Sequence, residues 1–260
     1  MSTNVPTNSE RLSQLEKEND ELRNSIMELK RFVKQTMGSY VTPEVANQIL
    51  EQNDTIGIDG ERRLVTMLFT DLRDSTALSE QMEATDYIRL LNHYFWCMIQ
   101  IVNSWQGNIL DFVGDALVVV FGAPKENPDA ARDALYSAVA MQRRMEAVNE
   151  WNAAQGYPSI QMGIGVHTGE AIVGTIGSKV RMKYDMIGRN VNLASRIEGF
   201  SKGGQILAST QTMEAARANG DLILEREEGS MWVSPKGIAS DVLVHDVIGV
   251  NRLHIPEWWT

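Results

Sequence analysis

The sequence predicts an α+β domain that has a mostly antiparallel sheet with helices on one face. Two observations lead to this fold class. Apolar runs of strand length alternate with segments of helical periodicity, in the order strand, helix, hairpin, helix, strand and then a mixed region. The chain also has 260 residues, of which 43% are hydrophobic, so it can bury one sizeable core.

The N-terminal segment, residues 1–38, predicts a polar tip followed by a coiled-coil helix. Its core positions are spaced alternately three and four residues apart, which is the pattern of a coiled-coil seam. One core position holds Leu12, Asn19, Ile26 and Val33, and the other holds Leu15, Leu22, Leu29 and Thr36. A buried asparagine such as Asn19 often fixes a parallel two-stranded register. An amphipathic helix packed on its own domain is the alternative.

Residues 39–62 predict a short helix and a linker before the main domain. Thr42 suits the cap of that helix and Pro43 its first position, and the linker reads NDTIGIDGERR. The main domain is expected over residues 63–250. A C-terminal tail follows over residues 251–260, and it ends with two tryptophans, Trp258 and Trp259.

Periodicity and turn residues predict the elements of the main domain. The run RLVTMLFTD is an apolar strand that ends in an acid, and helical spacing covers residues 78–105 and about 128–153. Between these helices, ILDFVGDALVVVF has Gly114 between two apolar runs and so predicts a hairpin. IQMGIGVHTGEAIVGTIG predicts two strands with a glycine-rich connection. The remaining expected elements are a helix over about 190–199, a strand in GQILAST, a helix near 211–218 and strands near 222–227 and 241–249.

Composition restricts the class of protein. The formal net charge of -10 argues against general nucleic-acid binding, which needs a basic surface. The one cysteine, Cys97, has no disulfide partner, which favours a reducing compartment. No run approaches the roughly 18 consecutive apolar residues of a transmembrane segment, and the N-terminus lacks the apolar core of a signal peptide. We therefore expect a soluble cytoplasmic protein.

Two aspartates stand where apolar strands end. Asp71 closes the first strand, and Asp115 follows Gly114 in the expected hairpin turn. A carboxylate at the edge of a buried sheet is costly to ionise unless a cation compensates its charge. If the two converge, they would bind Mg²⁺ or Mn²⁺ through hard oxygen ligands, and a two-metal site suits phosphoryl chemistry. The alternative is two unrelated aspartates in caps or turns.

The stretch YDMIGRNVNLASRIE, residues 184–198, predicts a helix after Gly188 that has Asn192 and Arg196 on one face. An amide and a guanidinium that project together can orient a sugar and stabilise a charged phosphate. The alternative is a surface helix with ordinary polar residues.

Four motifs together resemble the class III nucleotide cyclases. They are FTDLRDST, VGDALVVVFGAP, GVHTGEAIVGTIG and YDMIGRNVNLASRIE, and they occur in the order that this family shows. The resemblance covers roughly residues 60–250. It implies a ferredoxin-like βαββαβ core with extensions, which agrees with the expected order of elements.

The resemblance implies a two-metal reaction on a nucleoside triphosphate. Asp71, Asp115 and the Leu72 carbonyl would hold two divalent cations, Mg²⁺ or Mn²⁺. The ribose 3′-hydroxyl would attack the α-phosphate, and pyrophosphate would leave. Asn192 would orient the ribose, and Arg196 would stabilise the charge on the α-phosphate.

Two further features are implied by the same likeness. Lys236 matches the lysine that binds the terminal phosphates, although Ile238 stands where the family usually has a second basic residue. Family members work as dimers because each site takes its metal aspartates from one chain and its asparagine, arginine and lysine from the other. We therefore expect a homodimer with shared active sites, which a parallel coiled coil at the N-terminus would hold together.

Two positions are implied to read the base. In adenylate cyclases a lysine typically donates to adenine N1, and an aspartate or threonine accepts from the 6-amino group. In guanylate cyclases a glutamate faces the N1–H and 2-amino groups. Asp185 fits the adenine pattern, but Asp111 stands where the lysine is expected. Adenine N1 facing an unpaired Asp111, or guanine O6 facing Asp185, would cost about 1–3 kcal/mol. Protonation, a bridging water or pairing with a neighbour such as Lys183 would remove either clash.

The sequence therefore predicts an adenylate cyclase that converts ATP to cyclic AMP and pyrophosphate. A guanylate cyclase that uses GTP, or a cyclase with relaxed base specificity, is the alternative within the class. A catalytically silent nucleotide-binding regulator is the alternative from another class, and the intact set of site residues counts against it. A purely structural dimerisation module would leave the acids at strand ends unexplained.

Overall fold

The computed structural model describes residues 8–37, 60–178, 181–218, 223–238 and 240–250. The chain divides into two units, Met1–Ile56 and Gly57–Thr260. The short helix and most of the linker expected over residues 39–62, and the tail expected over residues 251–260 with its two tryptophans, lie outside the described residues.

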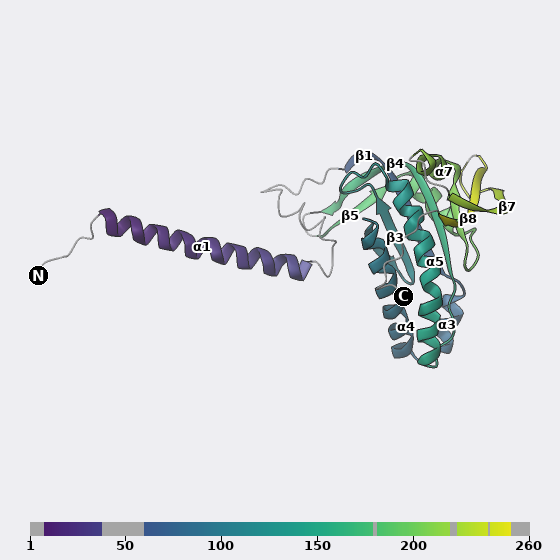
Figure 1. The fold of residues 1–260 in the computed structure, drawn as a ribbon, viewed down its shortest axis with the longest axis horizontal. Coiled ribbons are helices and arrows are strands. Elements are labelled where there is room, and N and C mark those ends of the chain that lie inside the picture. Colours follow the sequence, from purple (N-terminus) through teal and green to yellow (C-terminus); the bar gives the residue numbers. More distant parts are fainter. Residues whose placement is uncertain (1–7, 38–59, 179–180, 219–222, 239, 251–260) are drawn as a thin grey trace, which may run out of the picture. The chain divides into compact units, whose positions relative to one another are not determined.

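The described part of the first unit is one long helix, α1 (Asn8–Met37) (Figure 1). The apolar residues of the predicted seam are exposed on the single chain: Leu12, Leu15, Leu22 and Leu29 are each about 60% exposed, and Ile26 is 45% exposed. An apolar stripe that is open to water on a helix of this length is the surface that coiled-coil pairing buries. The coiled coil itself stays a prediction.

The second unit is built on one eight-stranded sheet with the strand order β2-β3-β1-β4-β6-β8-β7. Its centre is β1 (Gly60–Leu72), which pairs antiparallel with β3 (Ala116–Phe121) on one side and with β4 (Met162–Ser178) on the other. β4 is parallel to β6 (Ile206–Ser209), and the other paired strands are antiparallel. The remaining strands are β2 (Asn108–Val113), β5 (Arg181–Ile187), β7 (Ile223–Val233) and β8 (Val242–Val250).

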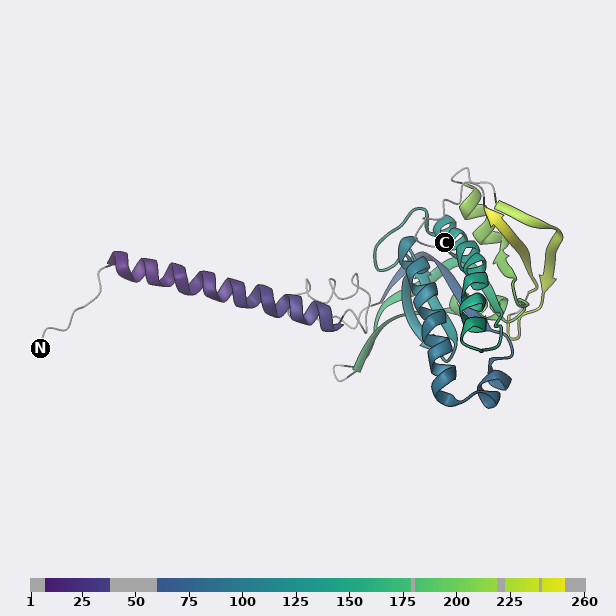
Figure 2. The same cartoon turned by 60° about the horizontal axis from the view of Figure 1, so that its bottom comes forward.

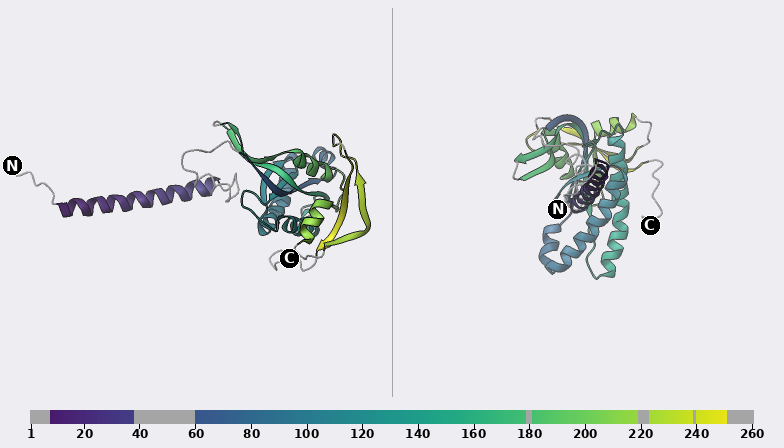
Figure 3. Two further views of the ribbon diagram at one scale, coloured as in Figure 1. Left: turned by 90° about the horizontal axis from the view of Figure 1, so that it is seen from above. Right: turned by 90° about the vertical axis from the view of Figure 1, so that its left-hand side faces the viewer.

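Three helices cover one face of this sheet: α4 (Ala84–Ser104), α5 (Ala130–Ala154) and α7 (Thr210–Arg217). The short helix α3 (Ser75–Gln81) has no buried residues and contacts the same core only through the half-buried Leu78. Figures 2 and 3 show α4 and α5 side by side on this face. Their apolar stripes and the strand residues on this face form one core, which includes Met98 of α4, Leu135 of α5 and Leu68 of β1. Burying each such side chain contributes about 1.5–3 kcal/mol. Among the described helices of the chain, none is both long enough and apolar enough to cross a bilayer.

The opposite face of the sheet is also covered, which differs from the expectation of helices on one face. Helix α6 (Arg189–Glu198) packs there through Val191 and Ala194, with Tyr184 and Met186 of β5, on strand residues that include Met67. The far half of β4 and β5 form a two-stranded arm that projects from the sheet (Figure 3). The expected element order did not include β5, although its sequence RMKYDMI alternates polar and apolar residues from Arg181 to Met186.

The prediction of two strands with a glycine-rich connection at IQMGIGVHTGEAIVGTIG was wrong. These residues form the single strand β4, which pairs with β1 from Gly60 to Leu72 without a break. Two of the glycines, Gly165 and Gly169, allow close contact with helix α6 and do not form a turn. A side chain at Gly165 would collide with the backbone of Glu198, and one at Gly169 would collide with Asn190. The glycines therefore allow α6 to pack directly against the backbone of β4.

Candidate functional site

The two predicted metal ligands converge at the end of β1. Gly114 has a φ of 66°, which favours glycine, and it closes a two-residue turn between β2 and β3. This turn directs Asp115 back to the neighbouring strand, where its Oδ2 accepts a hydrogen bond of 3.0 Å from the backbone N–H of Leu72. Asp71 is the residue just before this buried leucine.

The two carboxylates of this pair repel each other, and a bound cation would relieve the repulsion. Burial raises the pKa of Asp71, and the nearby charge of Asp115 raises it further, against the opposing effect of Arg73. Both carboxylates offer the hard oxygen atoms that Mg²⁺ and Mn²⁺ prefer. No cluster of three or more His, Cys, Asp or Glu occurs among the described residues, and Mg²⁺ usually binds through one or two carboxylates with substrate phosphates. The donor set therefore fits a divalent cation that takes its remaining ligands from water or from a bound phosphate.

Two charged residues beside this pair were not predicted from the sequence. Arg73 lies 3.3 Å from the Asp71 carbonyl and 3.8 Å from its carboxylate, and it also forms an ion pair with Glu198 at the end of α6. Burial raises the pKa of Glu198 to about 7, Arg73 lowers it, and the charges of Asp71 and Asp115 raise it. Both residues occur inside the motifs that suggested the site. The available signals were therefore a basic residue two positions after Asp71 and an acidic residue two positions after Arg196.

Helix α6 positions the two residues predicted to act on the sugar and phosphate. It begins after Gly188, whose φ of 147° few other residues adopt, and it presents Asn192 to solvent one turn before the half-buried Arg196. A Cβ atom on Gly237 would lie 3.5 Å from Nη1 of Arg196, so the guanidinium lies against the loop that carries the exposed Lys236. The structure thus brings Arg196 and the Lys236 loop together.

The two predicted base-reading residues lie on either side of one lysine. Nζ of Lys183 is 2.6 Å from Oδ2 of Asp111 and 3.1 Å from Oδ2 of Asp185. The lysine and Asp185 are two residues apart on β5, so they share one face of the strand, and Asp111 reaches them from β2. The pairing with Lys183 considered from the sequence is therefore present in the structure for both aspartates.

The predicted residues thus form three groups in a single chain. Asp71, Leu72 and Asp115 form one, Asp111 and Asp185 form the second, and Arg196 with the Lys236 loop forms the third. Within the described part of the chain, no hydrogen bond or ion pair links Asn192, Arg196 or Lys236 to the two metal aspartates.

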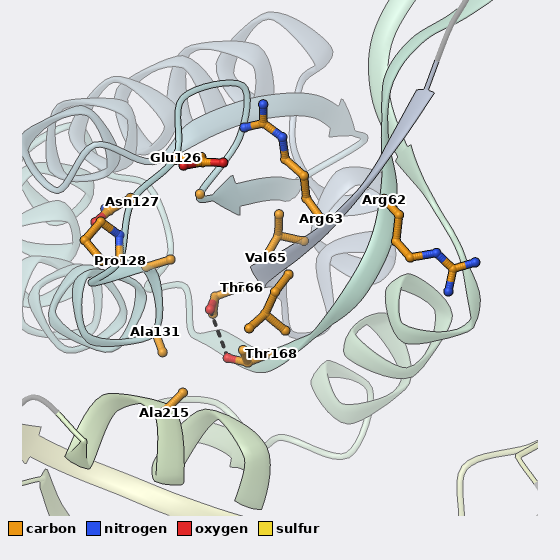
Figure 4. A pocket seen from close by; sticks show the side chains of 13 residues that line it. Arg62, Arg63, Val65, Thr66, Glu126, Asn127, Pro128, Ala131, Thr168 and Ala215 are labelled. Atoms are coloured by element: carbon orange, nitrogen blue, oxygen red, sulfur yellow. Dashed lines mark hydrogen bonds between the residues drawn. The ribbon is translucent and has the colours of Figure 1, made fainter.

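A pocket of about 590 Å³ lies along the first half of β1, away from these groups (Figure 4). Its wall includes Thr66 and Thr168, whose hydroxyls are 2.9 Å apart, and two arginines. Arg62 is paired with Glu170 and Arg63 with Glu61, so both positive charges are already compensated. None of the residues predicted to bind nucleotide or metal lines this pocket.

The chain resembles proteins that carry the same kind of domain. It is 32% identical over 219 residues to "Adenylate cyclase 1" of Rhizobium meliloti (strain 1021), covering 84% of this chain and 32% of that protein. It is 34% identical over 187 residues to an adenylate cyclase of Anabaena cylindrica, covering 70% of this chain and 35% of that protein. The chain therefore spans about a third of the length of these curated relatives.

Solved structures have the same fold. The guanylyl cyclase Cya2 matches with a TM-score of 0.71 and 40% identity, over 75% of this chain and 96% of that one. The adenylyl cyclase CyaB from P. aeruginosa matches with a TM-score of 0.70 and 34% identity, over 76% of this chain and 100% of that one. The predicted α+β fold of the class III cyclases is thereby confirmed. The family model described as "Adenylate and Guanylate cyclase catalytic domain" matches residues 60–245, and the chain therefore belongs to this family.

Proposed function

We propose that this protein is a nucleotide cyclase that converts ATP to cyclic AMP and pyrophosphate. The observation that carries the proposal is the convergence of Asp71 and Asp115 at the end of β1, in a domain of the cyclase family. Two adjacent carboxylates that a bound divalent cation would neutralise suit a reaction on a polyphosphate. The adenylate cyclases among the relatives support the choice of reaction.

Each group of residues has a role in this reaction. Two Mg²⁺ or Mn²⁺ ions, held by Asp71, Asp115 and the carbonyl of Leu72, would supply the activation of the ribose 3′-hydroxyl and the neutralisation of the phosphates. Asn192 donates to the ribose and keeps its 3′-oxygen in line with the α-phosphate. Arg196 donates to the α-phosphate oxygens, whose negative charge grows as the new bond forms.

The triphosphate and the base are bound by the remaining groups. Lys236 pairs with the terminal phosphates, and its exposed position on the loop beside Arg196 supports this role. Asp185 accepts a hydrogen bond from the 6-amino group, which favours adenine. GTP is the second candidate substrate, because Asp111 offers an acceptor that guanine N1–H would satisfy, and because Cya2, at 40% identity, is a guanylyl cyclase.

The working unit in this proposal is a homodimer with two shared sites. Two observations support it: the apolar seam of α1 is exposed on one chain, and no hydrogen bond or ion pair joins the metal aspartates to Asn192, Arg196 or Lys236 among the described residues. In the dimer, one chain supplies the aspartates and its partner supplies the groups on α6 and the Lys236 loop. A similar chain, at 25% identity and a TM-score of 0.62, has been solved as a non-canonical dimeric guanylyl cyclase domain, so dimers do form among similar domains.

The test is product formation from ATP, GTP, CTP and UTP, each with Mg²⁺ or Mn²⁺, followed by chromatographic separation of the cyclic products. Cyclic AMP as the main product is expected from the wild-type protein, and Asp71→Asn should lose it. Cyclic GMP as the main product would overturn the choice of substrate. The absence of any cyclic product under all eight combinations would overturn the cyclase proposal and favour a silent regulator.

A further inference from the structure

Lys183 joins two strands that do not pair with each other. β2 is at one end of the sheet, whereas β5 pairs only with the arm of β4. Leu110 of β2 and Tyr184 of β5 pack on the same apolar cluster, which brings the two strands close on one face. The Lys183 ammonium then lies between Asp111 and Asp185, at 2.6 Å and 3.1 Å from their carboxylate oxygens.

Stability does not account well for this arrangement. The side chains of Lys183, Asp111 and Asp185 are 41%, 45% and 33% exposed. Ion pairs with this much exposure contribute little to folding, because water and salt screen them. The carboxylates do keep the lysine charged: burial opposes the charge, yet the bonds to Asp111 and Asp185 outweigh it and raise the pKa of Lys183. The result is a persistent cation at the surface between two acids.

The three groups form an array of hydrogen-bonding atoms in the order acceptor, donor, acceptor. An ammonium has three N–H donors, and the two carboxylates take two of them. One donor is therefore left for a third acceptor. Each carboxylate also keeps lone pairs for a further donor. The adjacent donor and acceptor of Lys183 and Asp185 match the edge of adenine, which presents the acceptor N1 beside the donor 6-amino group.

We propose that Lys183 is the specificity-determining residue that donates to N1 of the adenine base. This inference rests on the proposed adenylate cyclase function. Asp185 accepts from the 6-amino group in the same complex, and Asp111 holds the ammonium in position without contacting the base. A lysine on β5 thereby supplies the donor that an aspartate at position 111 cannot. The array is complete within one chain, as all three residues come from the same protomer.

The test asks whether the contribution of the Lys183 side chain to activity depends on N1 of the adenine ring. The ratio kcat/KM is measured for ATP and for 1-deaza-ATP, which has a C–H group in place of N1. Wild-type protein is expected to use 1-deaza-ATP less well by about tenfold to a hundredfold, the factor expected for one hydrogen bond to a charged donor. Lys183→Met should lose a similar factor with ATP and should no longer distinguish the two nucleotides.

Two further variants keep the test decisive. Lys125→Met makes the same change at an exposed loop position and should discriminate as the wild type does. Asp111→Asn keeps the lysine and leaves an amide oxygen that still accepts a hydrogen bond from it, so it should retain most of the preference for ATP over 1-deaza-ATP even if Lys183→Met folds poorly. If Lys183→Met discriminates as strongly as the wild type, or if Asp111→Asn abolishes discrimination, the role of Lys183 is refuted.

The outcome also separates this inference from the function on which it rests. Wild-type protein that forms no cyclic AMP from ATP refutes the proposed function. Wild-type protein that forms cyclic AMP while its discrimination is independent of residue 183 refutes only the inference.

Discussion

At the scale of single residues, Asp71 and Asp115 form a pair of carboxylates that repel each other in the chain without a bound cation. Asp71 and Asp115 come together from the end of β1 and the turn after β2, and the pKa of Asp71 is raised first by burial and then by this neighbour. Without a cation, the folded chain must tolerate the repulsion between them. A functional site that costs stability in this way is common, because its geometry serves the bound state.

The variant Asp115→Asn should separate the repulsion between the two carboxylates, which lowers stability, from the binding of a metal ion. Asparagine can still accept the hydrogen bond from Leu72, but it removes one of the two charges. We expect the melting temperature of the metal-free protein to rise by about 1–3 °C, because relief of the repulsion is a small fraction of the stability of a domain this size. Added Mg²⁺ should no longer raise the melting temperature, and cyclase activity should fall at least about a hundredfold.

Asp74→Asn is the matched control, because Asp74 is exposed and its positive φ is one that asparagine tolerates. This variant should still show the wild-type rise in melting temperature when Mg²⁺ is added. If Asp115→Asn still shows the wild-type shift of melting temperature with Mg²⁺, Asp115 is not a metal ligand.

At the scale of elements, close packing on β4 fixes the position of α6. Gly165 and Gly169 of β4 let the backbone of α6 approach closely, and Asn190 at the start of this helix donates to the Glu170 carbonyl over 2.7 Å. His167, also on β4, has its Nε2 3.3 Å from the side-chain oxygen of Asn190. The position of Asn192 and Arg196 therefore depends on the packing of α6 against β4.

Gly165→Ala tests this dependence. The added methyl group would meet the backbone of Glu198, so the helix must shift, and we expect a loss of about 1–3 kcal/mol in the free energy of unfolding. Denaturant titration measures this loss. Gly199→Ala is the control, because its φ is −61° and its Cβ would lie 3.5 Å from the nearest atom. Equal stability of the two variants would argue against close packing of α6 on β4.

His167 should make stability depend on pH. Burial lowers its pKa, against the opposing effect of its bond with Asn190, so the folded protein keeps a neutral ring. The unfolded chain binds a proton near pH 6.5, so it holds more protons than the folded chain below that pH, and stability falls as the pH drops through this range. The free energy of unfolding of His167→Gln should therefore fall less steeply between about pH 6.5 and pH 5. Parallel curves for the two proteins would show that His167 contributes nothing to this dependence.

At the scale of the whole molecule, the exposed seam of α1 and the division of the site into separate groups point to the same assembly. Two chains joined through α1 would bury Leu15, Leu22 and Leu29, which water surrounds in one chain. Each chain would then offer its aspartates to one site and its α6 residues to the other. Activity and dimerisation should consequently rise and fall together.

Leu22→Glu places a charge in the seam and should weaken dimerisation at least about tenfold, as measured by sedimentation equilibrium of the full chain. Specific activity should become dependent on protein concentration. Asn24→Glu, on the face of α1 away from the seam, is the matched control and should behave as the wild type does. Unchanged association by Leu22→Glu would exclude the coiled coil as the dimer interface.

The sequence by itself determined the fold class, the hairpin at Gly114 and most helices, because these follow from local periodicity and turn residues. It also indicated Asp71, Asp115, Asn192 and Arg196 as candidate site residues, since acids at strand ends and the polar face of one helix are visible in the chain. The remaining candidates, Leu72, Asp111, Asp185 and Lys236, followed only from the family resemblance. Nothing in the structure or the comparisons tests their roles, which stay predictions.

Only the tertiary structure decided which of these residues meet. It placed Asp115 on the backbone of Leu72, Arg73 beside Glu198, and Lys183 between Asp111 and Asp185. It also made β4 one strand, where glycines suggested a turn, and set α6 on the second face of the sheet. Local patterns could not show these contacts, because each joins elements far apart in the chain and depends on how strands twist and pack. A glycine needed for a turn and one needed for close packing are the same letter in a sequence, and only the neighbouring helix distinguishes them.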